Sequence, residues 1–248
     1  HDAFIITKGG VRWESEQGRA RARTWCDNSP DYLARAIEDS LRRLRIDVIP
    51  LYFVHWPDES TSLPRVLDAL REARHRGRIQ GYGLANFAAE AVLECGPATG
   101  IEAVQASYNL LSEDAELEDL YRFGWAGFER YGYGALAQGL LTGKYGPDTR
   151  FGDDDRRHRL TQFEAERWPR AEALLGQLGR IAECMGRNVA QVALQAARQS
   201  GFVEHVIVGI KSPEQVHDLC GLGGWRLAEG DLRALMNAAR QPARTVAG

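Results

Sequence analysis

Lysine is scarce in this sequence. Of its 31 basic residues only Lys8, Lys144 and Lys211 are lysines, and all the others are arginines. Such a bias is typical of a GC-rich genome and indicates little about binding partners. It does make each remaining lysine a candidate for a role that arginine cannot fill.

Long apolar runs are absent as well. No stretch approaches the roughly 18 residues that a membrane-spanning helix needs, which excludes an integral membrane protein. The formal net charge is −3 with both signs mixed along the chain, so nothing indicates a nucleic-acid partner. Six Trp, eight Tyr and eight Phe provide ample material for a core, and this argues against a disordered chain.

Cysteines are few and far apart, at positions 26, 95, 184 and 220. No C-x-x-C pair and no histidine cluster at metal-ligand spacing occurs, which argues against a metal site and a disulfide framework. The N-terminal stretch HDAFIITKGG lacks the basic start, apolar run and cleavage site of a signal peptide, so we expect a cytoplasmic protein. Because the first residue is not Met, the chain is compatible with a start inside a longer protein.

The length of 248 residues suits one domain, since single α/β barrels often have about 250 residues. Short apolar runs alternate with amphipathic stretches, a rhythm typical of repeated βα units. The predicted strands are residues 4–7, 47–54, 79–85, 103–107, 126–133 and 205–208. The predicted helices are residues 30–45, 63–76, 88–95, 116–123, 169–185, 188–200, 213–219 and 229–240, the first of them capped by Ser29. Strands separated by helices predict parallel pairing with right-handed crossovers.

Two stretches interrupt this rhythm. A polar, Arg-rich loop is expected after Lys8-Gly9-Gly10. Gly, Pro, Asp and Arg dominate residues 145–168, where 153–159 reads DDDRRHR. This composition predicts a mobile loop insertion, in preference to an interaction surface.

Functional groups of parallel α/β barrels stand at the carboxyl ends of the strands. Here those positions are polar: Lys8, His55, Asn86, Gln105, Tyr133 and residues 209–212. Lys8 either lies in a cleft or extends its ammonium to water. His55, which precedes Trp-Pro-Asp, is either functional or a satisfied structural histidine. Asn86 and Gln105 could bind a ligand or tie loop backbone together.

Two later segments suit an anion. The run GALAQGLLTGK at 134–144 is neither G-x-G-x-x-G nor a P-loop, because Lys144 is followed by Tyr145. Its backbone could still approach a phosphate closely, with Lys144 supplying the charge. Lys211-Ser212-Pro213 places a cation and a hydroxyl at a helix N-terminus, which favours either an anion site or an ordinary N-cap.

Six segments together resemble the aldo-keto reductase family. They are IITKGG around Lys8, LYFVHWPD around His55, GYGLANF at 81–87, VQASYNLL at 104–111, GALAQGLLTGKY at 134–145 and VIVGIKSPEQV at 206–216. They occur in the family's order and spacing and cover essentially the whole chain. The combination is specific, although single segments are not, and all three lysines lie within it.

The resemblance implies a (β/α)8 TIM barrel that binds NADPH across the strand ends and reduces an aldehyde or ketone by hydride transfer. It implies that Lys8 lowers the pKa of a catalytic Tyr and that His55 hydrogen-bonds the substrate oxygen. It also implies that Asn86 and Gln105 hold the nicotinamide carboxamide, while Tyr133 stacks on the nicotinamide ring.

Further positions follow from the same resemblance. Gly139 and Lys144 border the pyrophosphate, and the loop with Lys211, Ser212 and Gln215 binds the 2′-phosphate, which favours NADPH over NADH. The substrate pocket is expected to be lined by Trp13, Trp25 and Trp56. Their aromatic side chains suggest a small apolar or ring-shaped carbonyl compound.

The sequence also departs from the family pattern. The family's catalytic Asp and Tyr lie on two βα units before the strand that ends at Lys8, and no such pair is visible here. We therefore expect one domain, residues 1–248, with only about six βα units (strands 3 to 8 of the barrel). Ala85 replaces a usual Ser and Leu219 a usual Asn, each costing about 0.5–1.5 kcal/mol of cofactor binding.

Two alternatives stay open on the sequence. One is a catalytically inactive, nucleotide-binding or regulatory homologue, suggested by the missing Asp and Tyr and by Ala85. The other is a specialised biosynthetic reductase. No membrane or nucleic-acid partner is expected, and a homo-oligomer is compatible with the sequence.

Overall fold

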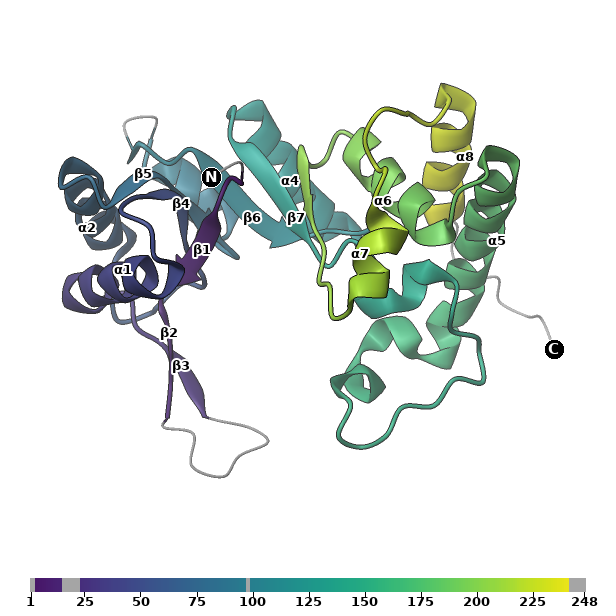
Figure 1. The fold of residues 1–248 in the computed structure, drawn as a ribbon, viewed down its shortest axis with the longest axis horizontal. Helices are drawn as coiled ribbons and strands as arrows, with labels where there is room; N and C mark the ends of the chain where they lie inside the picture. Colours follow the sequence, from purple (N-terminus) through teal and green to yellow (C-terminus); the bar gives the residue numbers. More distant parts are fainter. Residues whose placement is uncertain (1–2, 15–22, 97–98, 241–248) are drawn as a thin grey trace. The chain divides into compact units, whose positions relative to one another are not determined.

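The computed structural model describes residues 3–14, 23–96 and 99–240. The chain forms two compact units (Figure 1). Unit 1 comprises residues 1–106 and 119–130, and unit 2 comprises residues 107–118 and 131–248. Helix α4 (Asp114–Trp125) and strand β7 (Glu129–Tyr133) each run from one unit into the other.

The centre of unit 1 is a parallel sheet with strand order β1-β4-β5-β6. Its strands are β1 (Ile6–Gly9), β4 (Ile49–Val54), β5 (Ile79–Ala85) and β6 (Ala103–Ser107), the last residue of which belongs to unit 2. Strands β4 and β5 are buried almost throughout, as expected for parallel strands covered on both faces. The register pairs Lys8 with Phe53 and Ala85 with Gln105. The polar residues in or after these strands therefore lie toward the same end of the sheet, at the carboxyl ends of the strands.

Helices α1 (Pro30–Leu44), α2 (Leu63–His75) and α3 (Ala89–Glu94) complete unit 1. Helix α1 starts where Pro30 follows Ser29, because a proline is tolerated at the first helical position. Its buried residues Leu33, Ile37 and Leu41 recur at helical spacing and pack into the core. Helices α1 and α2 lie side by side (Figure 1).

Two short antiparallel strands lie in the stretch after Gly10 where a loop is expected, and residues 15–22 of that predicted loop lie outside the described residues. Strands β2 (Val11–Trp13) and β3 (Thr24–Cys26) pair with each other, and the amide of Asp27 closes the base of the hairpin on the carbonyl of Gly10 at 3.0 Å. Gly10 has φ of +98°, a left-handed conformation that other residues rarely adopt. With three residues per strand, the alternation of side chains is too short to be recognised in the sequence.

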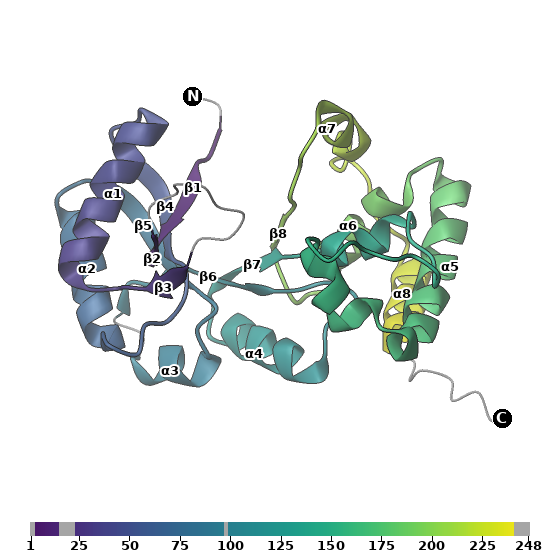
Figure 2. The same ribbon diagram turned by 90° about the horizontal axis from the view of Figure 1, so that it is seen from below.

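Unit 2 is mainly helical. Helices α5 (Trp168–Met185), α6 (Val189–Gln199) and α8 (Glu229–Arg240) pack together around residues such as Leu174, Leu178 and Leu235 (Figure 2). Asn188 and Gln191 form a capping box, which starts α6 with three residues between it and the end of α5 at Met185, where Gly186 is the C-cap. Strand β8 (His205–Ile207) pairs in parallel with the end of β7, and α7 (Pro213–Leu219) follows it.

Local structure also occurs in residues 145–168, the predicted insertion. They contain the 3₁₀ helices η3 (Arg156–Arg159), η4 (Thr161–Phe163) and η5 (Ala165–Arg167). The rings of Tyr145, Phe151 and Phe163 meet edge to face with centroids 4.8–5.7 Å apart. The aromatic contacts give this segment a small apolar cluster, and its mobility stays a prediction.

The six predicted strands correspond to β1 and β4 to β8, with β1 two residues later than expected. Within the described ranges, no helix is long and apolar enough to cross a membrane. The same residues contain no group of three or more His, Cys, Asp or Glu side chains that could hold a metal ion.

Candidate functional site

Four of the predicted site residues lie at the strand ends of unit 1. This strand-end group consists of Lys8 in β1, His55 after β4, Asn86 after β5 and Gln105 in β6. The carboxyl ends of neighbouring parallel strands meet at one edge of a sheet, and the side chains and backbone of the group are joined by hydrogen bonds there.

Lys8 and Gln105 are in direct contact although 97 residues separate them in sequence. The Nζ of Lys8 donates a hydrogen bond to Oε1 of Gln105. Lys8 is half-buried, and this burial lowers the pKa of its ammonium. Gln105 is only 1% exposed, and its Nε2 has no hydrogen-bond partner among the described residues.

Asn86 connects neighbouring strands. Its backbone amide donates to the carbonyl of Gln105 and its Nδ2 donates to the carbonyl of His55, both at 2.8 Å. Its φ of +64° is left-handed, a conformation that Asn adopts more readily than most residues. Asn86 therefore fixes the backbone at the strand ends on both sides of β5.

His55 is placed directly after β4 by a hydrogen bond from its amide to the carbonyl of Gly9 at 2.8 Å. Burial, and then the positive charge of Lys8, lower the pKa of its imidazole. The ring stacks on Trp56 with centroids 6.2 Å apart. The imidazole is consequently neutral at neutral pH and can donate or accept one hydrogen bond at each nitrogen according to its tautomer.

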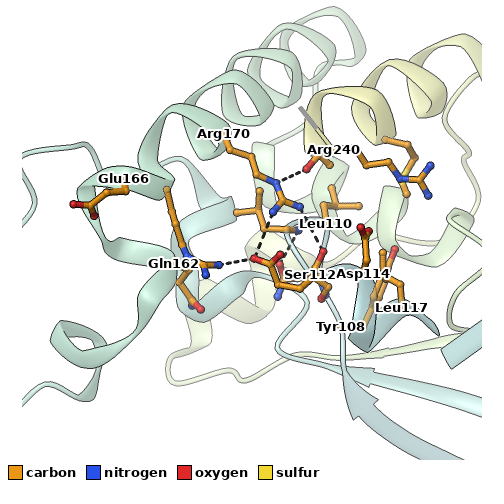
Figure 3. A pocket seen from close by; sticks show the side chains of 15 residues that line it. Tyr108, Leu110, Ser112, Asp114, Leu117, Gln162, Glu166, Arg170 and Arg240 are labelled. Carbon is orange, nitrogen blue, oxygen red and sulfur yellow. Dashed lines mark hydrogen bonds and ion pairs between the residues drawn. The ribbon is translucent and has the colours of Figure 1, made fainter. Parts of the chain in front are cut away.

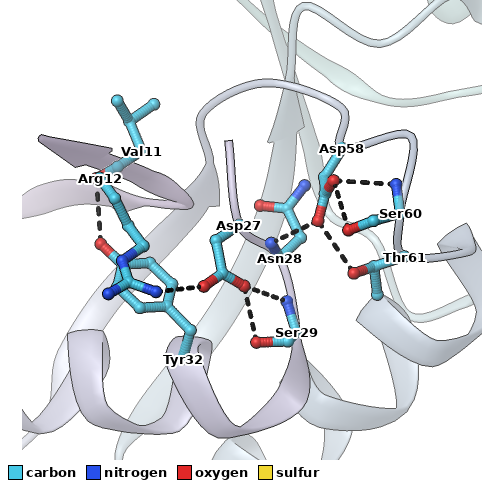
Figure 4. A network of polar contacts seen from close by, with 9 residues as sticks. All are labelled: Val11, Arg12, Asp27, Asn28, Ser29, Tyr32, Asp58, Ser60 and Thr61. Atoms are coloured by element: carbon cyan, nitrogen blue, oxygen red, sulfur yellow. Dashed lines mark hydrogen bonds and ion pairs between the residues drawn. The ribbon is translucent and has the colours of Figure 1, made fainter. Parts of the chain in front are cut away.

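A polar network holds the loop that follows His55 (Figure 4). One carboxylate oxygen of Asp58 accepts hydrogen bonds from the backbone amide of Asn28 and the hydroxyl of Thr61, each at 2.9 Å. The other oxygen accepts from the backbone amide and the hydroxyl of Ser60. The fully buried Asn28 also donates from Nδ2 to the carbonyl of Trp56 at 2.9 Å. The roles of Asn28 and Asp58 were not predicted from the sequence. For Asp58 the sequence contains one signal, the run Asp-x-Ser-Thr at 58–61, which is typical of an Asx turn.

A second carboxylate anchors the hairpin to α1 (Figure 4). Asp27 accepts from Arg12 at 2.9 Å and from both the amide and the hydroxyl of Ser29. Burial raises the pKa of Asp27, but the hydrogen bonds from Ser29 and Arg12 outweigh this effect and the net pKa is lowered. The Tyr32 hydroxyl donates to the carbonyl of Val11 at 3.0 Å.

The three tryptophans predicted to line a substrate pocket are all exposed. In the hairpin register Trp25 is opposite Arg12, while Trp13 is opposite Thr24. Directly paired residues share a face, so Trp13 and Trp25 point to opposite faces of the hairpin. The guanidinium of Arg12 lies over the Trp25 ring at 5.3 Å. A pocket on one face of the hairpin can therefore be lined by Trp56 and by either Trp13 or Trp25, but not by all three tryptophans.

The remaining predicted residues lie in unit 2. We call Gly139, Lys144, Lys211, Ser212 and Gln215 the phosphate-side group. Gly139 has φ of +93°, inside the 3₁₀ helix η2 (Ala137–Thr142), and a Cβ there would lie 3.3 Å from Cε of Lys144. The Lys144 ammonium is 4.9 Å from the centroid of the Tyr145 ring. Glycine therefore keeps room for the Lys144 side chain against this turn.

Tyr133 ends β7, is half-buried and is paired with Ile207 of β8. Its carbonyl accepts from the amide of Tyr108 at 2.9 Å. These contacts fix the backbone from which the Tyr133 ring projects.

Ser212 and Gln215 shape the start of α7. The Ser212 hydroxyl accepts from the Gln215 amide at 3.4 Å, and Oε1 of Gln215 accepts from the Lys211 amide at 2.7 Å. Ser212 is thus an N-cap, and the backbone before the helix is held by Gln215. The Lys211 side chain is exposed and free to extend toward an anion.

Lys211 lines a pocket of about 490 Å³ in unit 2, together with Gln138 and residues 154–157. Arg157 forms a charge-assisted contact with Asp155, and this hydrogen bonding is the main reason why the pKa of Asp155 is lowered; the charge of Lys211 adds to it. The predicted insertion therefore brings a carboxylate and a guanidinium beside Lys211.

A second pocket of unit 2, of about 400 Å³, holds none of the predicted site residues (Figure 3). Arg170 occupies its centre, where it donates to the carbonyls of Ser112 and Ala239 and pairs with Glu113. Glu113 also pairs with Arg167. These contacts tie the loop before α4 to the ends of α5 and α8, which indicates a structural role.

Comparison with known proteins matches nearly the whole chain to one family. The model of the aldo/keto reductase family matches residues 1–239. An aldo-keto reductase of Bacillus subtilis, YhdN, is 27% identical over 234 residues, which are 92% of this chain and 67% of that protein. An aldo-keto reductase of Schizosaccharomyces pombe, whose name includes NADP(+), is 25% identical over 240 residues, 96% of this chain and 69% of that protein.

Solved structures agree. A glycerol dehydrogenase from Gluconobacter oxydans is similar with a TM-score of 0.86 and 29% identity, over 95% of this chain and 72% of that one. An aldo-keto reductase from Bacillus halodurans has a TM-score of 0.72 at 24% identity, over 96% of this chain and 74% of that one, and shows the fold alone. None of these matches supports the expectation that two N-terminal βα units are lacking, and a count of six units is not confirmed.

Proposed function

Because the chain belongs to the aldo/keto reductase family, an oxidoreductase family acting on carbonyl compounds, we propose that it reduces an aldehyde or ketone to an alcohol with NADPH. We further propose that its parallel strands belong to a (β/α)8 barrel and that residues 1–248 act as one barrel domain.

The observation that carries this proposal is the strand-end group. A half-buried lysine, a histidine of lowered pKa and a buried glutamine lie in or directly after strands β1, β4 and β6 of one parallel sheet, toward their carboxyl ends. Titratable groups with shifted pKa values gather at functional sites more often than elsewhere. Packing of the core does not require this combination, because apolar side chains would fill the same positions without the cost of burying an ammonium.

The residues present fit a nicotinamide cofactor. The Nε2 of Gln105 is a buried donor without a partner in the described part of the chain, which suits the carboxamide oxygen. Asn86 stands beside it, and Tyr133 is the aromatic residue that we propose to stack on the nicotinamide ring. In unit 2, Gly139 and Lys144 would border the pyrophosphate.

We assign the 2′-phosphate to Lys211, Ser212 and Gln215. The exposed ammonium of Lys211 beside a pocket supports this assignment. The NADP(+) in the name of the Schizosaccharomyces pombe relative agrees with a preference for NADPH.

The bound cofactor would supply the hydride, and the side chains of this chain would stabilise the charge that develops on the substrate oxygen. The neutral imidazole of His55 would hydrogen-bond that oxygen and orient it. The Lys8 ammonium would favour the alkoxide electrostatically, an effect that is strong where water is excluded. The substrate itself would be selected by the loops that carry Trp56 and the hairpin.

The test uses the full-length protein, a panel of aldehydes and ketones, and quenching of NADPH fluorescence. We expect binding of NADPH and its oxidation in the presence of at least one carbonyl compound. Lys8→Met should lower turnover by about 10²-fold or more, while NADPH is still bound and its affinity falls by about tenfold at most. Failure of the full-length protein to bind NADPH would refute the proposal, and binding without turnover would favour a non-catalytic homologue.

A further inference from the structure

The amide of Gln105 has two ends with different surroundings. An ammonium has only donors, so the end that faces Lys8 must be the amide oxygen. The nitrogen end therefore points away from Lys8, and it is buried without a partner among the residues that the structure describes. A buried N–H donor is costly to leave unpaired, which indicates that it is satisfied when a ligand is bound.

In the described part of the chain, the side chain of Gln105 is one of the groups that set the state of Lys8. Gln105 is the hydrogen-bond acceptor found for Nζ within the described ranges. In register beside Lys8 stands Phe53, which offers no side-chain acceptor. His55, which follows the neighbouring strand β4, is titratable. Burial and then the positive charge of Lys8 lower the pKa of its imidazole. The position and charge of Lys8 are thus set by burial, by His55 and by the Gln105 amide.

We propose that Gln105 is a positioning residue that connects the Lys8 ammonium, at its amide oxygen, to the carboxamide of the bound nicotinamide, at its amide nitrogen. This inference rests on the proposed function and adds a link within its site. Hydrogen bonds in series polarise one another, so a bond at either end of the amide strengthens the bond at the other end.

The link has a consequence with a definite sign. When the carboxamide oxygen accepts from Nε2, the amide oxygen becomes a better acceptor and stabilises the charged form of Lys8. Cofactor binding therefore raises the pKa of Lys8. By reciprocity, the charged form of Lys8 increases the affinity for the cofactor.

The scarcity of lysine makes the pKa of Lys8 directly measurable. Reductive methylation with an isotopic label gives few NMR signals, because residues 1–248 contain only three lysines. The signal of Lys8 is assigned by its loss in Lys8→Arg. Its titration is then followed in the free protein, with NADPH, and with 2′-phospho-ADP-ribose, which carries the same phosphates and lacks the nicotinamide.

We expect NADPH to raise the pKa of Lys8 by about one unit more than 2′-phospho-ADP-ribose does. In Gln105→Met this difference between the two ligands should vanish, and the pKa of Lys8 in the free protein should fall. Gln105→Glu, a replacement of equal size, should raise the pKa of Lys8 in the free protein. It provides the test if the methionine variant fails to fold.

Equal responses of Lys8 to the two ligands in the wild-type protein would overturn the inference. An unchanged pKa of Lys8 in the free Gln105→Glu or Gln105→Met protein would also overturn it, because a glutamine with only a structural role leaves Lys8 unaffected. The proposed function fails in a different way, through absence of NADPH binding in the fluorescence experiment.

Discussion

The strand-end group and the phosphate-side group are built from different kinds of contact. In the strand-end group, buried and half-buried side chains form hydrogen bonds such as Lys8 to Gln105 and Asn86 to the His55 carbonyl. In the phosphate-side group, Lys144 and Lys211 project exposed ammonium groups from loops. Buried hydrogen bonds fix direction and are little affected by salt, whereas exposed charges attract without fixing direction and are screened.

This contrast agrees with the roles that we propose for the two groups, one toward the nicotinamide and the other toward the phosphates. Hydride transfer depends on the exact orientation of reacting groups, which directional contacts between buried side chains provide. A phosphate carries its charge on several equivalent oxygens and tolerates a flexible cation. The comparison predicts that variants in unit 1 act on stability and chemistry, and that variants in unit 2 act on affinity in a salt-dependent manner.

The largest effect is expected from the buried network that holds the His55 loop. Asn28→Ala removes the Nδ2 donor to the Trp56 carbonyl inside a fully buried site. We expect a loss of about 1–3 kcal/mol in the free energy of unfolding, measured by urea denaturation at low and at high salt.

Ser60→Ala is the control, because it removes one side-chain hydrogen bond of the same network, to Asp58, from an exposed position. It should cost less than about 0.5 kcal/mol. A loss for Asn28→Ala that disappears at high salt would contradict the distinction between the two groups.

Much of the fold of unit 1 follows from local sequence signals. The apolar runs of β4, β5 and β6 and the start of α1 at Pro30 appear where the sequence predicts them. These signals are local because burial on both faces requires continuous apolar residues and because a helix start depends on adjacent residues. The position of His55 directly after a strand follows from the prediction of β4, whereas Lys8 lies inside β1, which is two residues later than expected.

The contacts between distant residues could not be predicted in this way. Lys8 and Gln105 are 97 residues apart, and Asn28 and Asp58 are 30 apart. No periodic pattern connects such pairs, since their contact depends on the order of strands in the sheet. The aromatic cluster of residues 145–168 was missed for the same reason, because its rings are separated by Gly, Pro and charged residues.

A smaller effect is expected at the phosphate side. Lys211→Ala should weaken NADPH binding about tenfold at low salt and leave NADH binding nearly unchanged, because we propose that the lost charge contacts the 2′-phosphate, which NADH lacks. Fluorescence titration with both cofactors measures this. The difference between wild type and variant should shrink as salt is raised toward 1 M.

Asp155→Asn is the counterpart with opposite sign. It removes a negative charge beside Lys211 and Arg157, so NADPH affinity should rise by a few fold at low salt. Lys211→Arg should keep most of the affinity. An effect of Lys211→Ala that does not depend on salt, or that is equal for NADH, would show that Lys211 acts through structure and would remove the contrast between the groups.

The smallest effect concerns acid stability. Burial raises the pKa of Asp58, but hydrogen bonds from Asn28, Ser60 and Thr61 outweigh it, so the net pKa lies below its usual value. A carboxyl group whose pKa is lowered by folding stabilises the protein above its unfolded pKa of about 3.9, and this contribution is lost as pH falls through the folded value. The free energy of unfolding should therefore decrease below about pH 4 in the wild type, and the decrease should be shallower in Asp58→Asn. Urea denaturation at a series of pH values measures both slopes. An equal slope in the two proteins would mean that the hydrogen bonds from Asn28, Ser60 and Thr61 do not hold Asp58 in its charged form.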